Sequence, residues 1–152
     1  LEPMIRTHAE SVARRLRRDG IQARTVVLKW KEGRRTAPGP RGYPLRSRRM
    51  TLPDPVDDGQ AIAMAACGLL QRSGPAVPIR LIGVGCTNLE VATVSQVQLF
   101  SEGSTQRKKN LNQVIDRIED RYGHGTLTRA GQKIVRRAGL SMQMKRGEKD
   151  QE

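Results

Sequence analysis

Basic and hydroxyl side chains alternate in one short segment of this sequence, which reads Arg46-Ser47-Arg48-Arg49 and is followed by Thr51. On a β-strand, Arg46 and Arg48 would face one way, while Ser47 and Arg49 would face the other. Guanidinium groups, hydroxyls and strand amides all donate hydrogen bonds to phosphate oxygens. The segment therefore predicts contact with a phosphate backbone, although a solvated basic strand would have the same composition.

Positive charge is concentrated in the first third of the chain. Residues 1–49 carry 14 Lys and Arg against 4 Asp and Glu, residues 50–100 carry 2 against 4, and residues 101–152 carry 12 against 7. The formal net charge of the 152 residues is +13, which indicates a polyanion partner such as nucleic acid. Aromatic residues make up only 3% of the chain, so a platform that stacks single-stranded bases is disfavoured. Contact with the backbone is favoured over reading of the bases.

No group of residues predicts a catalytic site. The two histidines, His8 and His124, are far apart in the sequence. The acidic pairs at residues 57–58 and 119–120 suit a helix N-terminus and charge pairs along a helix. The Gly-Val-Gly sequence at residues 83–85 is too short to indicate a nucleotide-binding loop. The sequence therefore predicts a binding protein, with no catalytic residue and no metal ligand in this chain.

Cysteine content and hydropathy bound the class of protein further. Cys67 and Cys86 have neither CxxC spacing nor a nearby histidine, so they predict buried thiols rather than a zinc site or a disulfide. No apolar run approaches the roughly 18 residues of a membrane helix. Charges interrupt the N-terminal region where a signal peptide would be apolar. We expect one domain with a tail, and no membrane partner.

Five elements are predicted to position the basic segment. Apolar residues at helical spacing, with Gly20 behind them, predict a helix over residues 4–19. Alternation predicts strands over residues 23–30, 43–52 and 79–89. Asp57 or Asp58 is expected to cap a further helix that ends at Gly74, and its broad apolar face of small residues permits close packing. The segment Pro53-Asp54-Pro55 is expected to break the second strand.

The remaining third of the chain has a different composition. We divide the chain into a domain at 1–90, a polar linker at 91–105, a helical extension at 106–131 and a charged tail at 132–152, expected to be disordered. The extension predicts a helix over 106–121, which could pack on the domain or stay mobile. Its apolar stripe consists of Leu111, Val114, Ile115 and Ile118.

Three segments together resemble a known family. They are ESVARRLRRDGIQARTVVLKWK at residues 10–31, RSRRMTLPDPVDDGQAI at residues 46–62 and IRLIGVGCTNL at residues 79–89. In this order they resemble the little-finger domain of Y-family translesion DNA polymerases, with the DNA polymerase IV (DinB) group the nearest. The resemblance implies an α+β fold: a small, mostly antiparallel sheet with two helices on one face. Its first strand is expected to be missing, because the sequence starts at the first helix.

The resemblance also implies a role in damaged-DNA bypass and repair in the bacterial cytoplasm, associated with the nucleoid. The parent enzyme adds nucleotides with Mg²⁺ through carboxylates of a palm domain, which this chain lacks, so we expect it to be inactive alone and without a cofactor. The other face of the sheet would grip the template and primer backbones of DNA. The residues predicted to bind DNA are Arg24, Lys29, Lys31, Arg46, Ser47, Arg48, Arg49 and Thr51.

A second motif follows the domain and reads Gln96-Val97-Gln98-Leu99-Phe100. It resembles the peptide with which bacterial polymerases dock on the sliding clamp. Leu99 and Phe100 would be adjacent apolar anchors, and the amide of Gln96 would orient the peptide. The other interpretation is that Leu99 and Phe100 fold back over the core.

Two classes of function therefore remain open. The first is the C-terminal portion of a translesion polymerase, in which a DNA-gripping domain is tethered to the sliding clamp. The alternative is a freestanding basic nucleic-acid-binding accessory protein without polymerase activity. A ribosome-associated basic protein fits the clustered arginines and scarce aromatics, but it does not explain the motif that ends at Phe100.

Overall fold

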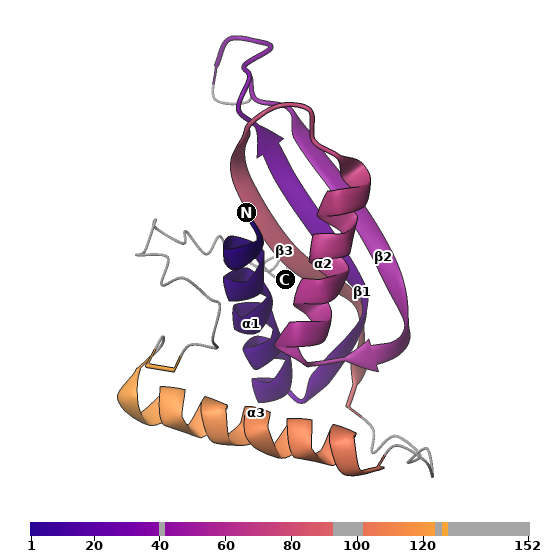
Figure 1. The fold of residues 1–152 in the computed structure, drawn as a ribbon, viewed down its shortest axis with the longest axis vertical. Helices are drawn as coiled ribbons and strands as arrows, with labels where there is room; N and C mark the ends of the chain where they lie inside the picture. The colour runs from indigo at the N-terminus through magenta and orange to yellow at the C-terminus, as the bar shows by residue number, and fades with distance from the viewer. Residues whose placement is uncertain (40–41, 93–101, 124–125, 128–152) are drawn as a thin grey trace, which may run out of the picture.

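A computed structural model describes residues 1–39, 42–92, 102–123 and 126–127. Within these residues three strands form one antiparallel sheet, in the order β2-β1-β3. The helices α1 and α2 cover one face of this sheet, as Figure 1 shows. The α+β class, with helix, strand, strand, helix and strand in that order, is therefore confirmed. The elements are α1 (Glu2–Arg18), β1 (Ile21–Glu32), β2 (Leu45–Val56), α2 (Gly59–Ser73), β3 (Ile79–Val91) and α3 (Glu102–Tyr122).

Residues at the helix ends explain where the two core helices, α1 and α2, begin and end. Gly20 follows α1 with a φ of 65°, a left-handed conformation that suits glycine. Asp58 caps α2, because its side chain accepts a hydrogen bond of 3.0 Å from the backbone N–H of Ala61. Gly74 ends α2 in the left-handed conformation, and its N–H donates to the carbonyl of Leu70. The predicted boundaries of both helices are confirmed to within about two residues.

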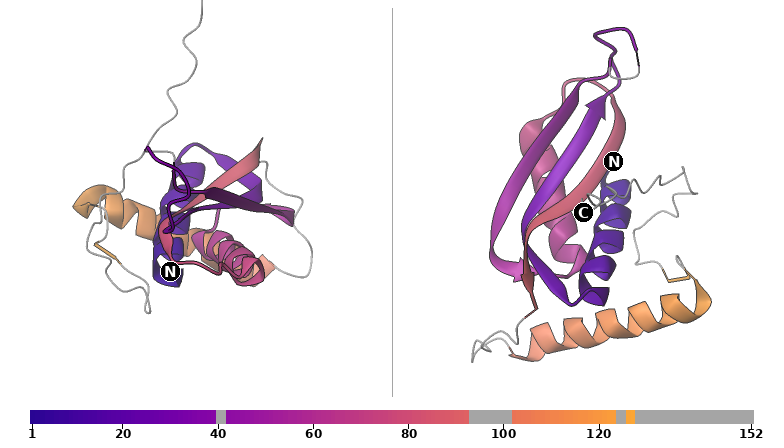
Figure 2. Two further views of the ribbon diagram at one scale, coloured as in Figure 1. Left: turned by 90° about the horizontal axis from the view of Figure 1, so that it is seen from above. Right: turned by 180° about the vertical axis from the view of Figure 1, so that it is seen from behind.

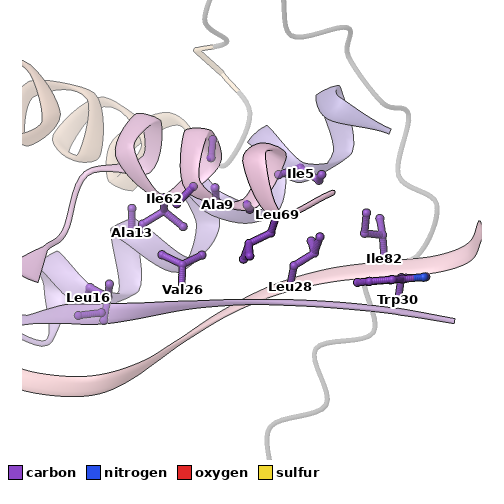
Figure 3. Close-up of a cluster of buried hydrophobic side chains, with 14 residues drawn as sticks. Ile5, Ala9, Ala13, Leu16, Val26, Leu28, Trp30, Ile62, Leu69 and Ile82 are labelled. Carbon is purple, nitrogen blue, oxygen red and sulfur yellow. The ribbon is translucent and has the colours of Figure 1, made fainter. Parts of the chain in front are cut away.

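The core lies between the two helices and the sheet, as Figure 3 shows. From β1, Val26, Leu28 and Trp30 point toward the helices and are almost fully buried. Small residues on both helices, such as Ala9 and Ala66, are also buried and let the helices approach each other and the sheet closely. The predicted alternation of β1 is confirmed. The burial of these side chains supplies most of the favourable free energy of folding.

Strand β2 continues further than the sequence predicts. Pro53 and Pro55 were expected to end it, but it runs on to Val56. The strand lies at the edge of the sheet, where a missing backbone N–H removes no central hydrogen bond. Its register with β1 also shifts there, since Thr51 pairs with Thr25 whereas Val56 pairs with Ala23. The expected break is therefore wrong, because an irregular edge strand accommodates both prolines.

Helix α3 lies across one end of the domain, beside the C-terminal end of α1 (Figure 1 and Figure 2). It begins at Glu102, four residues before the predicted start at Gln106 and inside the predicted linker. Its polar face is the one that docks: Asn112 is 3% exposed, whereas Leu111 and Val114 are 52% and 49% exposed. The predicted apolar stripe is therefore divided, because Leu111 and Val114 are exposed whereas Ile115 and Ile118 are half-buried.

Ion pairs attach α3 to α1. The guanidinium of Arg17 donates to both carboxylate oxygens of Asp116, each at 2.7 Å, and also to Glu10. Arg14 donates to Glu119 and Asp120 at 2.9 and 2.6 Å. The side chains of Arg14 and Arg17 are 16% and 11% exposed, so these pairs are partly shielded from water.

Candidate nucleic-acid interface

The face of the sheet turned away from α1 and α2 is called the open face below. The right-hand view of Figure 2 looks onto it, with both helices behind the strands. Because side chains alternate along a strand, the burial of Leu28 and Trp30 on the helix side places Lys29 and Lys31 on the open face. Directly paired residues of an antiparallel sheet share a face, so the register assigns the residues of β2 and β3.

The open face consists of four rows, each with one residue from β2, β1 and β3. In the first row two leucines flank a lysine. Each of the middle two rows contains one cation and one glycine, and the last row consists of threonines. In order from β2 to β3, the rows are Leu45–Lys31–Leu81, Ser47–Lys29–Gly83, Arg49–Val27–Gly85 and Thr51–Thr25–Thr87.

Three cations of this face are available to a ligand. Lys29 and Arg49 are exposed and Lys31 is half-buried. Each ion pair formed between described residues involves other basic groups, so no carboxylate among them neutralises these three cations. They lie in adjacent rows on neighbouring strands, and their charges therefore add over a small area.

Beside these cations, β3 presents bare backbone. A Cβ atom built on Gly83 or Gly85 would have no atom within 4 Å, and neither residue has a positive φ. Neither packing within the described chain nor backbone conformation therefore requires glycine at these positions. The absence of two side chains lets a bulky ligand approach the strand closely beside Lys29.

The threonine row is held by its own hydrogen bonds. The hydroxyls of Thr25 and Thr51 are 3.2 Å apart, and the amide of Asn88 donates to Thr25 at 3.0 Å. Thr25 is 2% exposed, whereas Thr51 remains exposed and can offer its hydroxyl to a ligand. These hydrogen bonds connect side chains of all three strands at one end of the open face.

The predicted basic segment is divided between two sides of β2. Ser47 and Arg49 belong to the open face, whereas Arg46 and Arg48 pair with Trp30 and Leu28 and therefore point to the helix side of the edge. Arg46 also forms an ion pair of 2.8 Å with Glu32, and Arg48 donates to the carbonyl of Ser47. The predicted opposition of the two pairs of side chains is confirmed.

Arg24 lies apart from the cations of the open face. Its guanidinium donates to Glu90 at 2.8 Å and to the carbonyl of Pro53. The charge of Arg24 is therefore matched by a carboxylate. Of the eight residues predicted to contact DNA, the structure brings together five on the open face. These are Lys29, Lys31, Ser47, Arg49 and Thr51.

The sequence predicts no DNA-contacting residue on the β3 part of the open face. The sequence considers Gly83 and Gly85 only to exclude a nucleotide-binding loop, and it predicts no role for Leu45 and Leu81. The alternation of Ile82 with its neighbours does indicate which β3 residues avoid the core. Which of them lie beside Lys29 depends on the register, which is a long-range property.

The described residues provide no metal centre, because no three of their His, Cys, Asp and Glu side chains gather closely enough to hold an ion. Both cysteines are free thiols and are partly buried, and burial raises the pKa of Cys86 to about 11. None of the described helices combines the length and the hydropathy that crossing a membrane requires. The motif at residues 96–100 lies outside the described residues.

Comparison with known proteins identifies the family to which the chain belongs. Residues 1–99 match the impB/mucB/samB family C-terminal domain. The chain is 36% identical over 131 residues to DNA polymerase IV of Moorella thermoacetica, a match that covers 86% of this chain and 30% of the relative. DNA polymerase IV of Desulfatibacillum aliphaticivorans is 34% identical over 122 residues, which cover 78% of this chain and 29% of the relative.

The similarity continues beyond the domain, since DNA polymerase IV of Bacillus anthracis is 29% identical over 145 residues, or 93% of this chain and 33% of the relative. The chain thus spans about a third of the length of these relatives. Since the family match covers residues 1–99, the chain belongs to the Y-family DNA polymerases of the DNA polymerase IV (DinB) group, and it carries their C-terminal domain.

Proposed function

We propose that the open face binds the sugar–phosphate backbone of duplex or primer–template DNA, as the little-finger part of a translesion polymerase. The observation that carries this proposal is the grouping of Lys29, Lys31 and Arg49 beside the bare backbone of β3. Ser47 and Thr51 add neutral donors on the same face. Such a surface neutralises phosphates without reading base edges, so little sequence preference is expected.

In this proposal the chain grips DNA for a polymerase that bypasses lesions in the nucleoid of the bacterial cytoplasm. Nucleotide addition with Mg²⁺ belongs to palm carboxylates outside this chain. The alternative, a freestanding accessory protein that binds nucleic acid, would use the same open face. Sequencing the coding region immediately upstream separates the two, because only the polymerase requires palm carboxylates in the same reading frame.

A salt titration tests the binding itself. Association of the full chain with a fluorescent primer–template is measured between about 50 and 200 mM salt. If about six or more phosphates are engaged, counterion release should lower the affinity by about three orders of magnitude over this range. An affinity that does not vary with salt would overturn the proposal.

We further propose that residues 96–100 tether the chain to the sliding clamp. The sequence observation that favours this function is the position of the motif, which starts a few residues after β3 ends at Val91. Between Glu90 and Gln106 only Leu99 and Phe100 are apolar residues larger than valine. An apolar pair in a polar segment suits insertion into a partner pocket.

The test of clamp binding is a pull-down with purified bacterial clamp. Leu99→Ala/Phe100→Ala should lose most of the affinity, about 2 kcal/mol or more, because a few anchors carry such interfaces. DNA binding by the same variant should be unchanged, which serves as the control for folding. Equal retention of the clamp by wild type and variant would refute the tether.

A further inference from the structure

Two exposed leucines flank Lys31 on the open face. Leu45 on β2 and Leu81 on β3 both pair with Lys31 on β1, so the three side chains form one row across the sheet. Leu45 is 59% exposed and Leu81 is 53% exposed. This row lies at the end of the sheet next to the loop between β1 and β2, opposite the threonine row.

Neither leucine contributes to the folded core. The core lies on the helix side, where Ile82 next to Leu81 is 5% exposed and packs with Trp30 and its neighbours. A single exposed leucine is ordinary on a protein surface. Here two of them are held in register on either side of one cation, on the face that carries two further cations. The row therefore combines apolar area with positive charge.

The combination of apolar area and positive charge restricts which kind of partner can cover the leucine row. A second copy of this chain, packed face to face, would bring Lys29, Lys31 and Arg49 against like charges. An apolar protein surface would bury the ammonium of Lys31 without a counter-charge, which is costly. A DNA strand offers phosphate oxygens and, next to them along the backbone, the carbon surfaces of deoxyribose.

We propose that Leu45 and Leu81 pack against the deoxyribose carbons of bound DNA while Lys31 between them holds a phosphate. This inference rests on the proposed function, because it concerns the same open face. It adds an apolar component, which does not depend on salt, to an interface otherwise governed by charge. The leucine row would then anchor one end of the DNA contact, beyond the cations of the middle rows.

A plot of log affinity against log salt concentration separates the apolar from the ionic component. Loss of an apolar contact displaces the line, whereas loss of a phosphate contact changes its slope. Leu45→Ala/Leu81→Ala in the full chain should weaken binding to a primer–template about tenfold at every salt concentration, giving a line parallel to that of wild type. Lys29→Ala/Lys31→Ala should instead flatten the line, because fewer counterions are released. Met64→Ala is the matched control, since Met64 is an exposed apolar residue (66%) on α2 and should leave both slope and position unchanged.

Thermal unfolding establishes that the leucine variant is folded, and Leu45→Gln/Leu81→Gln, of similar size, is used if it is not. Unchanged DNA affinity in the leucine variant would overturn the inference, provided that wild type binds in a salt-dependent manner. A dimer that the leucine substitutions dissociate, with DNA binding intact, would also overturn it in favour of a second copy. Absence of salt-dependent binding by wild type would refute the proposed function itself, and the leucine contact with it.

Discussion

Basic residues on β1 and β2 differ in the surroundings that the sheet register gives them. Lys29 and Arg49 are exposed on the open face, where no described carboxylate pairs with them. Arg46 pairs with Glu32, and Arg48 points to the helix side of the edge strand. A cation that already has a partner, or that points away from the ligand, releases fewer counterions when DNA binds.

This contrast predicts unequal effects of two double substitutions that each remove two positive charges. Lys29→Ala/Arg49→Ala should reduce the slope of log affinity against log salt by about 2, since each lost phosphate contact removes about 0.9. Arg46→Ala/Arg48→Ala should reduce it by less than half as much. Fluorescence anisotropy with one primer–template measures both, and a larger effect of the second pair would contradict the assigned face.

Cys86 provides a pH-dependent prediction. Burial raises the pKa of its thiol from 9.0 to about 11, because the low-dielectric surroundings disfavour the thiolate. The unfolded chain therefore releases this proton at lower pH than the folded chain. The contribution of Cys86 to stability is fully present below about pH 9 and is lost as the pH rises toward 11.

Urea unfolding of wild type and Cys86→Ala at a series of pH values checks this sign. The free energy of unfolding of wild type should fall more steeply between pH 9 and 11 than that of the variant, because only wild type carries the thiol. Parallel curves would show that the thiolate is no less stable in the folded protein than in the unfolded chain.

At the scale of elements, α3 is the one whose docking depends most on charge. Arg17 contacts Asp116, Glu10 and the carbonyl of Asp57. Burial alone would lower the pKa of Arg17, but the hydrogen bonds and charges of Asp116 and Glu10 raise it above its ordinary value. Arg17 therefore stays charged, and α3 turns its acidic face toward it. The exposure of Leu111 and Val114 follows from this orientation.

Replacing Arg17 tests the ionic docking of α3. Arg17→Met should lower the free energy of unfolding by about 2 kcal/mol, because it leaves Asp116 partly buried without the guanidinium that donates to both of its carboxylate oxygens. Arg18→Met is the matched control on the same helix, since Arg18 is 75% exposed and its ion pair among the described residues is with its neighbour Asp19. The control should change stability by less than about 0.5 kcal/mol. Similar losses for both variants would indicate that the ion pairs contribute little.

At the scale of the whole molecule, two kinds of interaction hold the described elements together: apolar burial in the core and ion pairs near the surface. Strand β1 has partners on both sides and carries much of the core, so it opens only with the sheet. Helix α3 is held at one end of the domain by surface-proximal ion pairs and by a hydrogen bond from Asn112 to Asp58. Elements with few buried apolar contacts open at lower free energy than the core.

Native-state hydrogen exchange should therefore rank the elements. We expect the slowest exchange for amides of β1 and faster exchange for amides of α3, which can detach while the sheet remains folded. In Arg17→Met the exchange of α3 should accelerate further, and that of β1 much less. Uniform protection across β1 and α3 would mean that the whole chain unfolds as one cooperative unit.

Several features could be read from local sequence. The helix over residues 4–19 is observed as Glu2–Arg18, and the cap at Asp58 and the end at Gly74 are as predicted. Each depends on residues a few positions apart, through helical spacing, a side-chain cap or a left-handed glycine. The positive charge of the first third also follows from the order of residues alone.

Other features depend on residues that are distant in the chain. Pro53 and Pro55 indicate a strand end by local rules, but the edge position of β2 allows the strand to continue. The apolar stripe of α3 suggests a buried face, but Leu111 and Val114 stay exposed because Arg14 and Arg17 on α1 attract the acidic residues of the helix. In both cases a contact formed only in the tertiary structure outweighs a local preference.

The sequence by itself determined the elements, their order and the family, because these depend on short-range patterns and on residues that match position by position. Only the tertiary structure decided the composition of the open face. A shift of one residue in the pairing of β1 with β2 would exchange Arg49 for Arg48 beside Val27. That register depends on Met50 of β2 packing against the core beside Val26 of β1, a contact between residues distant in the sequence.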